Sequence, residues 1–308
     1  MSKFKRYLIL TVFTFIAIGS LLAGGKQEKF LGTTWRGLDN PLFGTVFTQL
    51  TPENAGKWYE VQQSDTFFSW TILDKMIDIA EERDMLTKEH TLIWYQRMPR
   101  WLKPEEAEEK VNIWFASIAE RYGTKIDMID AVNEPLDGKP DYFSGIDCGE
   151  GEWDWVIWSF ELARKYFPKA ELHINEYDIL NSSKKTAAYA EIIKALVDKK
   201  LVDAIGLQAH NLETTTPETI RANLETMKAF KLPIYITEWD LSIRDDEQQL
   251  QKVKEQFPIF WDDPQVKGIT LWGFLSGQTA RADAFLVRND GSYRPAFQWM
   301  LDYKDGKR

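Results

Sequence analysis

Strand-like and helix-like segments alternate along most of the chain, and this alternation limits the possible folds more than any other feature. Short runs rich in β-branched or aromatic residues lie at 30–35, 46–50, 86–94, 126–132, 172–177, 204–209, 234–239 and 268–274. Segments of helical period lie between most of them, at 70–83, 107–122, 153–166, 187–196, 217–230 and 247–261. Such a pattern implies parallel strands joined by helical crossovers.

A parallel sheet of this kind either closes into a barrel or stays open with helices on both faces. The open form usually carries a Gly-rich phosphate-binding loop after an early strand, and this sequence has no such loop. We therefore predict an α/β fold, a single (β/α)8 TIM barrel. The length of 308 residues suits one barrel. Because no linker or low-complexity tract interrupts the chain, we expect one domain over residues 28–308.

The first residues differ in kind from the rest. Three basic side chains, Lys3, Lys5 and Arg6, precede an apolar run over residues 7–17 and then several small residues. This order predicts a signal peptide over residues 1–25. An uncleaved membrane anchor is the alternative, because the apolar stretch approaches the length needed to span a bilayer. Either interpretation predicts an exported domain that is secreted, periplasmic or held at the cell surface.

Charge and metal-binding residues exclude several functions. The formal net charge of -9 gives no reason to expect nucleic acid as a partner, which usually requires clustered Lys and Arg. Cys148 is the only cysteine, and the three histidines are scattered without a close pair. We therefore expect no metal site and no cofactor.

Polar side chains stand at the ends of several predicted strands. They are Glu53, Asn54, His90, Asn133, Glu134, Asn175, Gln208, His210 and Glu238. In a β/α barrel the carboxyl ends of all strands point into one bowl, which is where active sites of this fold lie. Residues that are scattered in sequence would thus line a single pocket.

Two of these residues form a candidate catalytic pair. Glu134 ends the fourth predicted strand and Glu238 the seventh. Cleavage of an acetal needs one carboxyl that stays protonated and one that stays ionised, which two carboxylates facing each other across a pocket can supply. His210 and Asn133 are suited to tune them by hydrogen bonding. Taken alone, either glutamate would more often be a solvated rim residue or an ion-pair partner.

Seven motifs, in order, carry a resemblance to a known family. They are TPEN at 51–54 with Lys57-Trp58, HTLIW at 90–94, VNEP at 132–135, INEY at 174–177, GLQAH at 206–210, ITE at 236–238 and LWG at 271–273. The chain resembles glycoside hydrolase family ten from about residue 43 to residue 298. The members are mainly endo-β-1,4-xylanases with a β/α barrel.

The resemblance implies roles for the central residues. Glu134 would be the acid/base, Glu238 the nucleophile, and His210 the hydrogen-bond partner of the nucleophile. Asn133 would contact the 2-hydroxyl of the sugar being cleaved. The expected activity is retaining endo-hydrolysis of internal β-xylosidic bonds by double displacement.

The resemblance also implies which residues bind the polysaccharide or oligosaccharide substrate. Glu53, Asn54 and Lys57 would hold sugars on the non-reducing side, His90, Trp94, Gln208 and Trp272 would shape the cleavage subsite, and Asn175 and Tyr177 would lie on the leaving-group side. Without the motifs, Trp94 and Trp272 could simply fill the barrel, and His90 and His210 could be core histidines. His173 matches no motif, and we expect it to be structural.

The sequence departs from the family pattern at three positions. Tyr95 and Arg97 replace a usual histidine and glutamine, and Ala280 stands where a tryptophan usually covers the cleavage subsite. These changes could favour a branched or acidic glycan, with Arg97 facing the substrate. Alternatively, Arg97 pairs with a neighbouring acid at the rim. The span between the first strand and Thr51 also leaves little room for a full first helix.

Two other functions remain open from the sequence. The protein could be a retaining hydrolase of a different or unusually substituted β-glycan, or a non-catalytic glycan-binding relative. The second is disfavoured because both carboxylates and their supporting residues are present. We expect the protein to act as a monomer.

Overall fold

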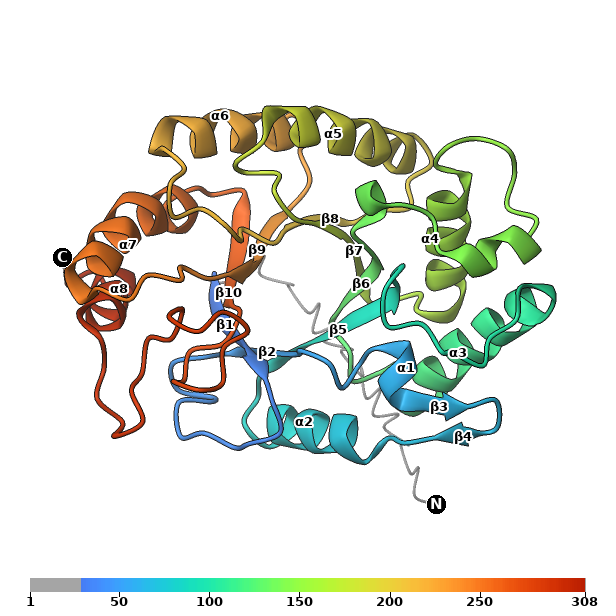
Figure 1. Ribbon diagram of the computed structural model, residues 1–308, viewed down its shortest axis with the longest axis horizontal. Helices are drawn as coiled ribbons and strands as arrows, with labels where there is room; N and C mark the ends of the chain where they lie inside the picture. Colours follow the sequence, from blue (N-terminus) through green and yellow to red (C-terminus); the bar gives the residue numbers. More distant parts are fainter. Residues whose placement is uncertain (1–28, 308) are drawn as a thin grey trace, which may run out of the picture.

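A computed structural model describes residues 29–307 (Figure 1). The predicted signal peptide over residues 1–25, with its anchor alternative, lies outside the described residues. Within the described part of the chain, no helix combines the length and apolar character that a membrane span requires.

Eight strands of the described chain close into a parallel barrel in the order β1-β10-β9-β8-β7-β6-β5-β2. Their bounds are β1 (Phe30–Trp35), β2 (Gln49–Pro52), β5 (Leu86–Ile93), β6 (Met128–Asn133), β7 (Glu171–Glu176), β8 (Ala204–Leu207), β9 (Ile234–Trp239) and β10 (Val266–Leu271). Figure 1 shows these strands at the centre of the molecule with the helices around them. The predicted (β/α)8 barrel is confirmed.

Seven helices of the described chain surround the barrel; the first six match the predicted helical segments closely, and the last was not predicted. They are α2 (Thr71–Glu82), α3 (Ala107–Tyr122), α4 (Asp154–Tyr166), α5 (Ser183–Asp198), α6 (Pro217–Lys228), α7 (Asp246–Trp261) and α8 (Pro295–Lys304). Short 3-10 turns occur at η1 (Pro104–Glu106), η2 (Pro135–Asp137) and η3 (Asp141–Gly145). Helix α5 begins four residues before the predicted segment, because the Ser182 hydroxyl accepts a hydrogen bond from the backbone N–H of Lys185 and caps the helix there.

The barrel interior changes character from one end to the other. At the amino ends of the strands, Phe30, Met128 and Tyr235 form a small apolar cluster, and Gly268 leaves the space that the Phe30 ring fills. His173 stacks on Tyr235 at 4.6 Å between ring centroids in this layer. Polar groups occupy the other end of the interior, so the barrel itself separates the packed floor from the site above it.

The region between β1 and α2 differs from a regular barrel. No helix joins β1 to β2, in agreement with the short span seen in the sequence. After β2 the chain instead forms a short helix α1 (Trp58–Val61) and an antiparallel hairpin of β3 (Gln62–Ser64) and β4 (Phe67–Phe68), which the sequence analysis did not predict. The hairpin is fixed by tertiary contacts, because Phe68 stacks on Trp70, and Trp58 and Trp70 both stack on Trp114.

Arg294 anchors the long segment between β10 and α8. The side chain is 1% exposed, and its Nε donates to Asp246 at the start of α7 at 2.7 Å. Its Nη atoms donate to four backbone oxygens, those of Ile243, Arg244, Asp283 and Phe285. One buried guanidinium therefore ties the segment after β10 to the segment after β9.

Replacing Arg294 with methionine should lower the free energy of unfolding by about 3 to 5 kcal/mol, because buried acceptors lose their donor. Arg288→Met is the matched control, since Arg288 also pairs with Asp246 but is partly exposed, and it should cost less than about 1 kcal/mol. Urea denaturation of both variants measures the difference. Equal losses would show that Arg294 has no special role.

Candidate active site

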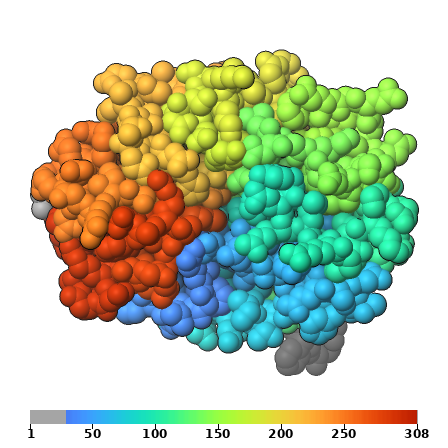
Figure 2. Space-filling model, in the orientation of Figure 1, coloured from blue at the N-terminus to red at the C-terminus, as the bar shows by residue number. Residues whose placement is uncertain are grey.

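The predicted polar residues gather at the carboxyl ends of the strands. Loops from distant parts of the sequence meet over this end of the barrel. Near the middle of the face in Figure 2, the segments after β2 (blue), β5 (teal) and β10 (red) come together. Backbone hydrogen bonds at the strand ends hold the main chain of both glutamates. The Glu134 N–H donates to the Asn175 carbonyl, and the Glu238 N–H donates to the Gln208 carbonyl.

Glu134 follows β6 in a left-handed backbone conformation, with φ 54° and ψ 51°. Such a conformation is uncommon for a residue other than glycine and often marks a functional position. The carboxylate accepts two side-chain hydrogen bonds, from Trp94 Nε1 at 2.7 Å and from Gln208 Nε2 at 3.0 Å. The Trp94 indole is therefore part of the site.

Glu238 lies in β9 and is 4% exposed. Its Oε1 accepts a hydrogen bond from Asn175 Nδ2 at 2.7 Å, and its Oε2 lies 3.2 Å from His210 Nε2. Both oxygens are thus held, and the carboxylate has a fixed orientation.

An amide network joins the two carboxylates. Asn133 Oδ1 accepts from Asn175 Nδ2 at 2.8 Å and from Gln208 Nε2 at 3.3 Å. Each of these amides also donates to one carboxylate, Asn175 to Glu238 and Gln208 to Glu134. Asn175 is fully buried within this network, where its amide bonds to site residues, whereas the resemblance placed it on the leaving-group side.

The two carboxylates have pKa values shifted in opposite directions. Burial, together with the charge of Glu238, raises the pKa of Glu134 above its usual range despite the hydrogen bonds from Gln208 and Trp94. Burial would also raise the pKa of Glu238, but the hydrogen bond from His210 and the charges of His90 and His210 outweigh it and lower that pKa. One group is thus suited to carry a proton and the other to stay ionised.

His210 is held between two carboxylates. Its Nδ1 lies 2.9 Å from Asp240 Oδ1, opposite the contact of its Nε2 with Glu238. Burial lowers the pKa of His210, but the hydrogen bonds to Asp240 and Glu238 overcome this and raise it to about 10. Arg281 donates to the same Asp240 oxygen at 3.0 Å and pairs with Glu213 at 2.7 Å.

A second charged group lies below the site. Asp130 pairs with Lys88 at 2.7 Å and with His90 Nδ1 at 2.8 Å, all three being buried. Burial opposes ionisation of Asp130, but the charge of Lys88 and the hydrogen bond of His90 lower its pKa to about 2. Trp272 packs edge-on against both His90 and His210 and so forms part of the wall of the site.

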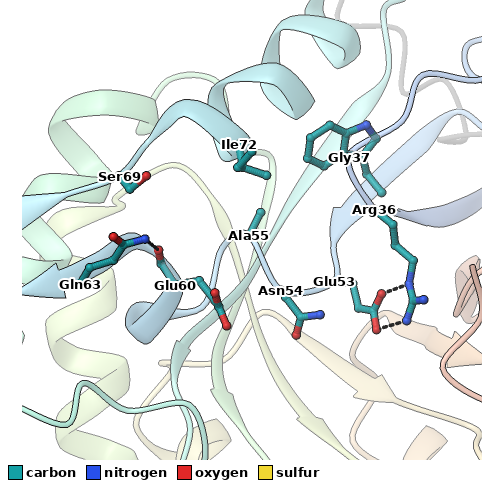
Figure 3. A pocket seen from close by; sticks show the side chains of 10 residues that line it. Arg36, Gly37, Glu53, Asn54, Ala55, Glu60, Gln63, Ser69 and Ile72 are labelled. Atoms are coloured by element: carbon teal, nitrogen blue, oxygen red, sulfur yellow. Dashed lines mark hydrogen bonds and ion pairs between the residues drawn. The ribbon is translucent and has the colours of Figure 1, made fainter.

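The non-reducing-side residues predicted from the resemblance form a continuous wall. Glu53 pairs with Arg36, and Asn54 Oδ1 accepts from Lys57 Nζ at 3.1 Å. Lys57 also lies 4.7 Å from the centroid of the Trp94 ring. Burial lowers the pKa of Lys57 to about 8, although Glu238 opposes this shift. A cavity of about 490 Å³ opens beside Glu53 and Asn54 (Figure 3).

The opposite side of the site carries a different cluster. The Tyr177 hydroxyl donates to Asp137 at 2.8 Å, and the Tyr95 hydroxyl donates to the same carboxylate at 3.0 Å. Lys185 Nζ lies 3.4 Å from the centroid of the Tyr177 ring. Tyr95, one of the departures from the family pattern, therefore orders the loop that follows Glu134.

The other departures lie at the rim. Arg97 is about half exposed and pairs with Glu60 at 3.3 Å, which matches the rim ion pair considered from the sequence. Ala280 is exposed in the segment after β10. His173, expected to be structural, lies in the floor of the barrel and contacts Glu171 and Tyr235.

Sequence reasoning missed several residues of the site: Arg36, Asp130, Asp137, Asp240 and Arg281. Asp240 could have been found, because it lies two positions after Glu238 along an extended segment and so points to the same side. Arg281 comes from an irregular segment where no periodicity predicts direction. Among residues 29–307, no group of three or more His, Cys, Asp or Glu side chains could hold a metal ion.

Two carboxyl groups of opposite protonation preference at the carboxyl end of a closed β/α barrel are an arrangement that glycoside hydrolases use. The chain belongs to glycosyl hydrolase family 10, whose family model matches residues 16–303.

Several known proteins are similar to this chain. Endo-1,4-beta-xylanase B of Cellvibrio japonicus is 33% identical over 282 residues, which cover 89% of this chain and 46% of that protein. Beta-1,4-xylanase of Dictyoglomus thermophilum is 28% identical over 259 residues, covering 76% of this chain and 72% of the relative. The crystal structure of xylanase 10B from Thermotoga petrophila in complex with xylobiose superimposes with a TM-score of 0.78 at 25% identity, covering 92% of this chain and 95% of that one. The chain thus spans about half the length of the first of these relatives.

The two carboxylates around His210 should keep its imidazole protonated well above neutral pH. NMR titration should show His210 changing charge near pH 10, and Asp240→Asn should move that transition to lower pH because one hydrogen-bonded anion is lost. Asp262→Asn is a control outside the site, since Asp262 bonds to Tyr303, and it should leave the transition in place. A transition near pH 6.5 in the unaltered protein would contradict the proposed charge state.

Proposed function

We propose that this protein is a retaining endo-glycoside hydrolase that cleaves internal β-1,4-xylosidic bonds by double displacement. The observation that carries this proposal is the pair of carboxylates, Glu134 with a raised pKa and Glu238 with a lowered pKa, joined through one amide network. Membership of glycosyl hydrolase family 10 supports the same reaction.

In the first step, Glu134 donates its proton to the glycosidic oxygen while Glu238 attacks the anomeric carbon. The C–O bond to the leaving group breaks, and a covalent glycosyl ester forms on Glu238. The fixed orientation of Glu238, held by Asn175 and His210, reduces the motion needed to reach the anomeric carbon.

In the second step, Glu134 has lost its proton and acts as a base. It removes a proton from a water molecule, which attacks the anomeric carbon and displaces Glu238. Loss of the negative charge of Glu238 in the intermediate also lowers the pKa of Glu134, because the repulsion between the two carboxylates disappears. The same residue can therefore serve as acid and then as base.

Several findings support xylan as the substrate. The relatives in Cellvibrio and Dictyoglomus are described as xylanases, and the Thermotoga petrophila structure contains xylobiose. A xylose ring has apolar faces and an equator of hydroxyls, which suits a site with indole walls at Trp94 and Trp272 and amides at the rim. Sites on both sides of the carboxylates, at Asn54 and at Tyr177, suit cleavage within a chain.

We propose in addition that the protein is exported and acts as a monomer. The support for export is the order of basic, apolar and small residues in positions 1–25. The support for a monomer is that one chain contributes both carboxylates and all of their hydrogen-bond partners.

Changing Glu134 or Glu238 to glutamine should each reduce the rate of xylan hydrolysis on the order of thousandfold or more, because each removes an acid/base or nucleophilic group. An aryl glycoside with a good leaving group should partly rescue Glu134→Gln, whose first step then needs no proton, and should not rescue Glu238→Gln. Steady-state kinetics on both substrates measure the effect. Near-normal hydrolysis by either variant would remove that residue from the mechanism.

The stereochemistry of the first product tests double displacement. Proton NMR of a linear xylo-oligosaccharide during hydrolysis should show the β-anomer first, followed by slow conversion to the equilibrium mixture. A first-formed α-anomer would mean single displacement and would overturn the role of Glu238 as nucleophile.

A further inference from the structure

Glu134 lies at the start of a short loop that keeps it in the left-handed backbone conformation. The loop continues as η2 (Pro135–Asp137). The Glu134 N–H bonds to β7, whereas in the described chain its carbonyl oxygen bonds only to the Asp137 N–H, at 3.2 Å. A residue other than glycine keeps such a conformation only where surrounding contacts hold it. The contacts of Leu136 and Asp137 therefore decide where the Glu134 carboxyl lies.

The side chain of Asp137 is held by two phenol hydroxyls. The Tyr177 hydroxyl lies 2.8 Å from each carboxylate oxygen, and the Tyr95 hydroxyl donates to one of these oxygens at 3.0 Å. Lys185 Nζ adds an ion pair at 3.9 Å. These partners come from the segment after β5, the segment after β7 and helix α5. Three separate parts of the barrel thus converge on one carboxylate.

Glu176, the last residue of β7, holds the same loop at its backbone. It is fully buried, and its Oε2 accepts a hydrogen bond from the Leu136 N–H while its Oε1 accepts one from the Tyr177 N–H, both at 2.9 Å. Burial raises the pKa of Glu176 to about 8, although the two N–H groups oppose the shift. The proposed reaction assigns this carboxyl no task, although it belongs to the INEY motif.

The two donors to the Glu134 carboxylate do not replace these contacts. Trp94 and Gln208 each donate to one of its oxygens, and both donors are neutral. They orient the carboxylate only while the backbone of Glu134 places it between them. If the loop relaxed toward an ordinary backbone conformation, the carboxylate would move away from both donors.

We propose that Asp137 and Glu176 are positioning residues that hold the loop after Glu134, so that its carboxyl is aligned with the glycosidic oxygen. Tyr95 and Tyr177 act through Asp137, and these four residues form a clamp on the loop. The inference rests on the proposed function, since it assumes that Glu134 transfers the proton. It also gives a role to Tyr95, which departs from the family pattern.

A series of aryl β-xylobiosides that differ only in the acidity of the phenol tests the clamp. Tyr95→Phe and Glu176→Gln should each lower kcat/KM by about tenfold for the least acidic phenol and leave it within about twofold for the most acidic, because only a poor leaving group needs an aligned acid. Asp137→Ala should show a larger selective loss than Asp137→Asn, whose amide oxygen can still accept one phenol hydroxyl.

A matched control and a uniform loss define the contrary results. Tyr303→Phe also removes a phenol hydroxyl that donates to an aspartate, Asp262, but outside the site, and it should match the unaltered protein on every substrate. Equal losses across the series would mean that the clamp residues only pack or touch the leaving group. No loss with Tyr95→Phe, which removes a single hydroxyl and should fold normally, would also overturn the inference.

The titration of Glu134 tests the clamp without any substrate. Charged or titratable groups face Glu134 from several elements: Lys57 after β2, His90 in β5, Tyr95 after β5, Glu176 in β7, Tyr177 after β7 and Glu238 in β9. Tyr95→Phe removes none of the charges at neutral pH. If the loop relaxes, the pKa of Glu134 should nevertheless fall toward its ordinary range, because the carboxyl becomes less buried and lies farther from Glu238.

Carbon NMR of the whole protein with labelled glutamate measures this pKa, and the Glu134→Gln spectrum assigns the signal. If the unaltered protein hydrolyses none of the xylobiosides, the proposed function fails, and the titration still decides whether the clamp holds Glu134. A transition that moves to lower pH in Tyr95→Phe and stays in place in Tyr303→Phe would support the clamp. An unchanged transition in Tyr95→Phe would reject it.

Discussion

The site depends on one acceptor atom, the side-chain oxygen of Asn133. It receives the amides of both Asn175 and Gln208, and each amide passes its second N–H to a different carboxylate. This arrangement requires that β6, β7, β8 and β9 keep a fixed register, as the pairing of Asn133 with Asn175 shows. A one-residue slip of any strand would turn its amide to the other face of the sheet and separate the two glutamates. The packed barrel therefore serves to set the chemistry at its end.

The hydrogen-bond donors of the two glutamates explain how their pKa values differ. Glu238 accepts a hydrogen bond from His210, whose imidazole is held in its charged form by two carboxylates. Glu134 receives only neutral donors, an indole and an amide. Neutral donors do not compensate fully for burial, whereas a charged imidazole does. The difference in protonation thus follows from which donor reaches which carboxylate, since Gln208 and His210 both follow β8 and contact Glu134 and Glu238 respectively.

The sequence predicted alternating strands and helices because each strand has its own run of apolar residues, and the absence of a Gly-rich phosphate loop and the resemblance to family ten favoured a barrel over an open sheet. The predicted bounds of β1 agree with the structure to the residue. The predicted start of β2 is wrong, because the chain before Gln49 turns and is held by the packing of Phe47. The hairpin after α1 was missed because distant Trp114 stabilises it. Most of the site could be predicted from polar residues at the ends of the strands, because the carboxyl ends of all strands of a barrel meet on one face. The sequence has no periodic signal for irregular backbone. It therefore did not predict which way the Arg97 side chain points, or that Arg281 contacts Asp240.

The missing helix between β1 and β2 has a consequence for how the chain folds as it is made. In its place, Phe47 is completely buried, against Phe274 beyond the last strand and Phe297 in the final helix. The first strand also pairs with the last, Phe30 lying opposite Gly268. The first and last strands of the barrel, with Phe47 and the final helix of the described chain, thus cover each other. A nascent chain that still lacks β10 and α8 would leave one edge of β1 and the Phe47 ring uncovered, so closure of the barrel must wait for these two elements.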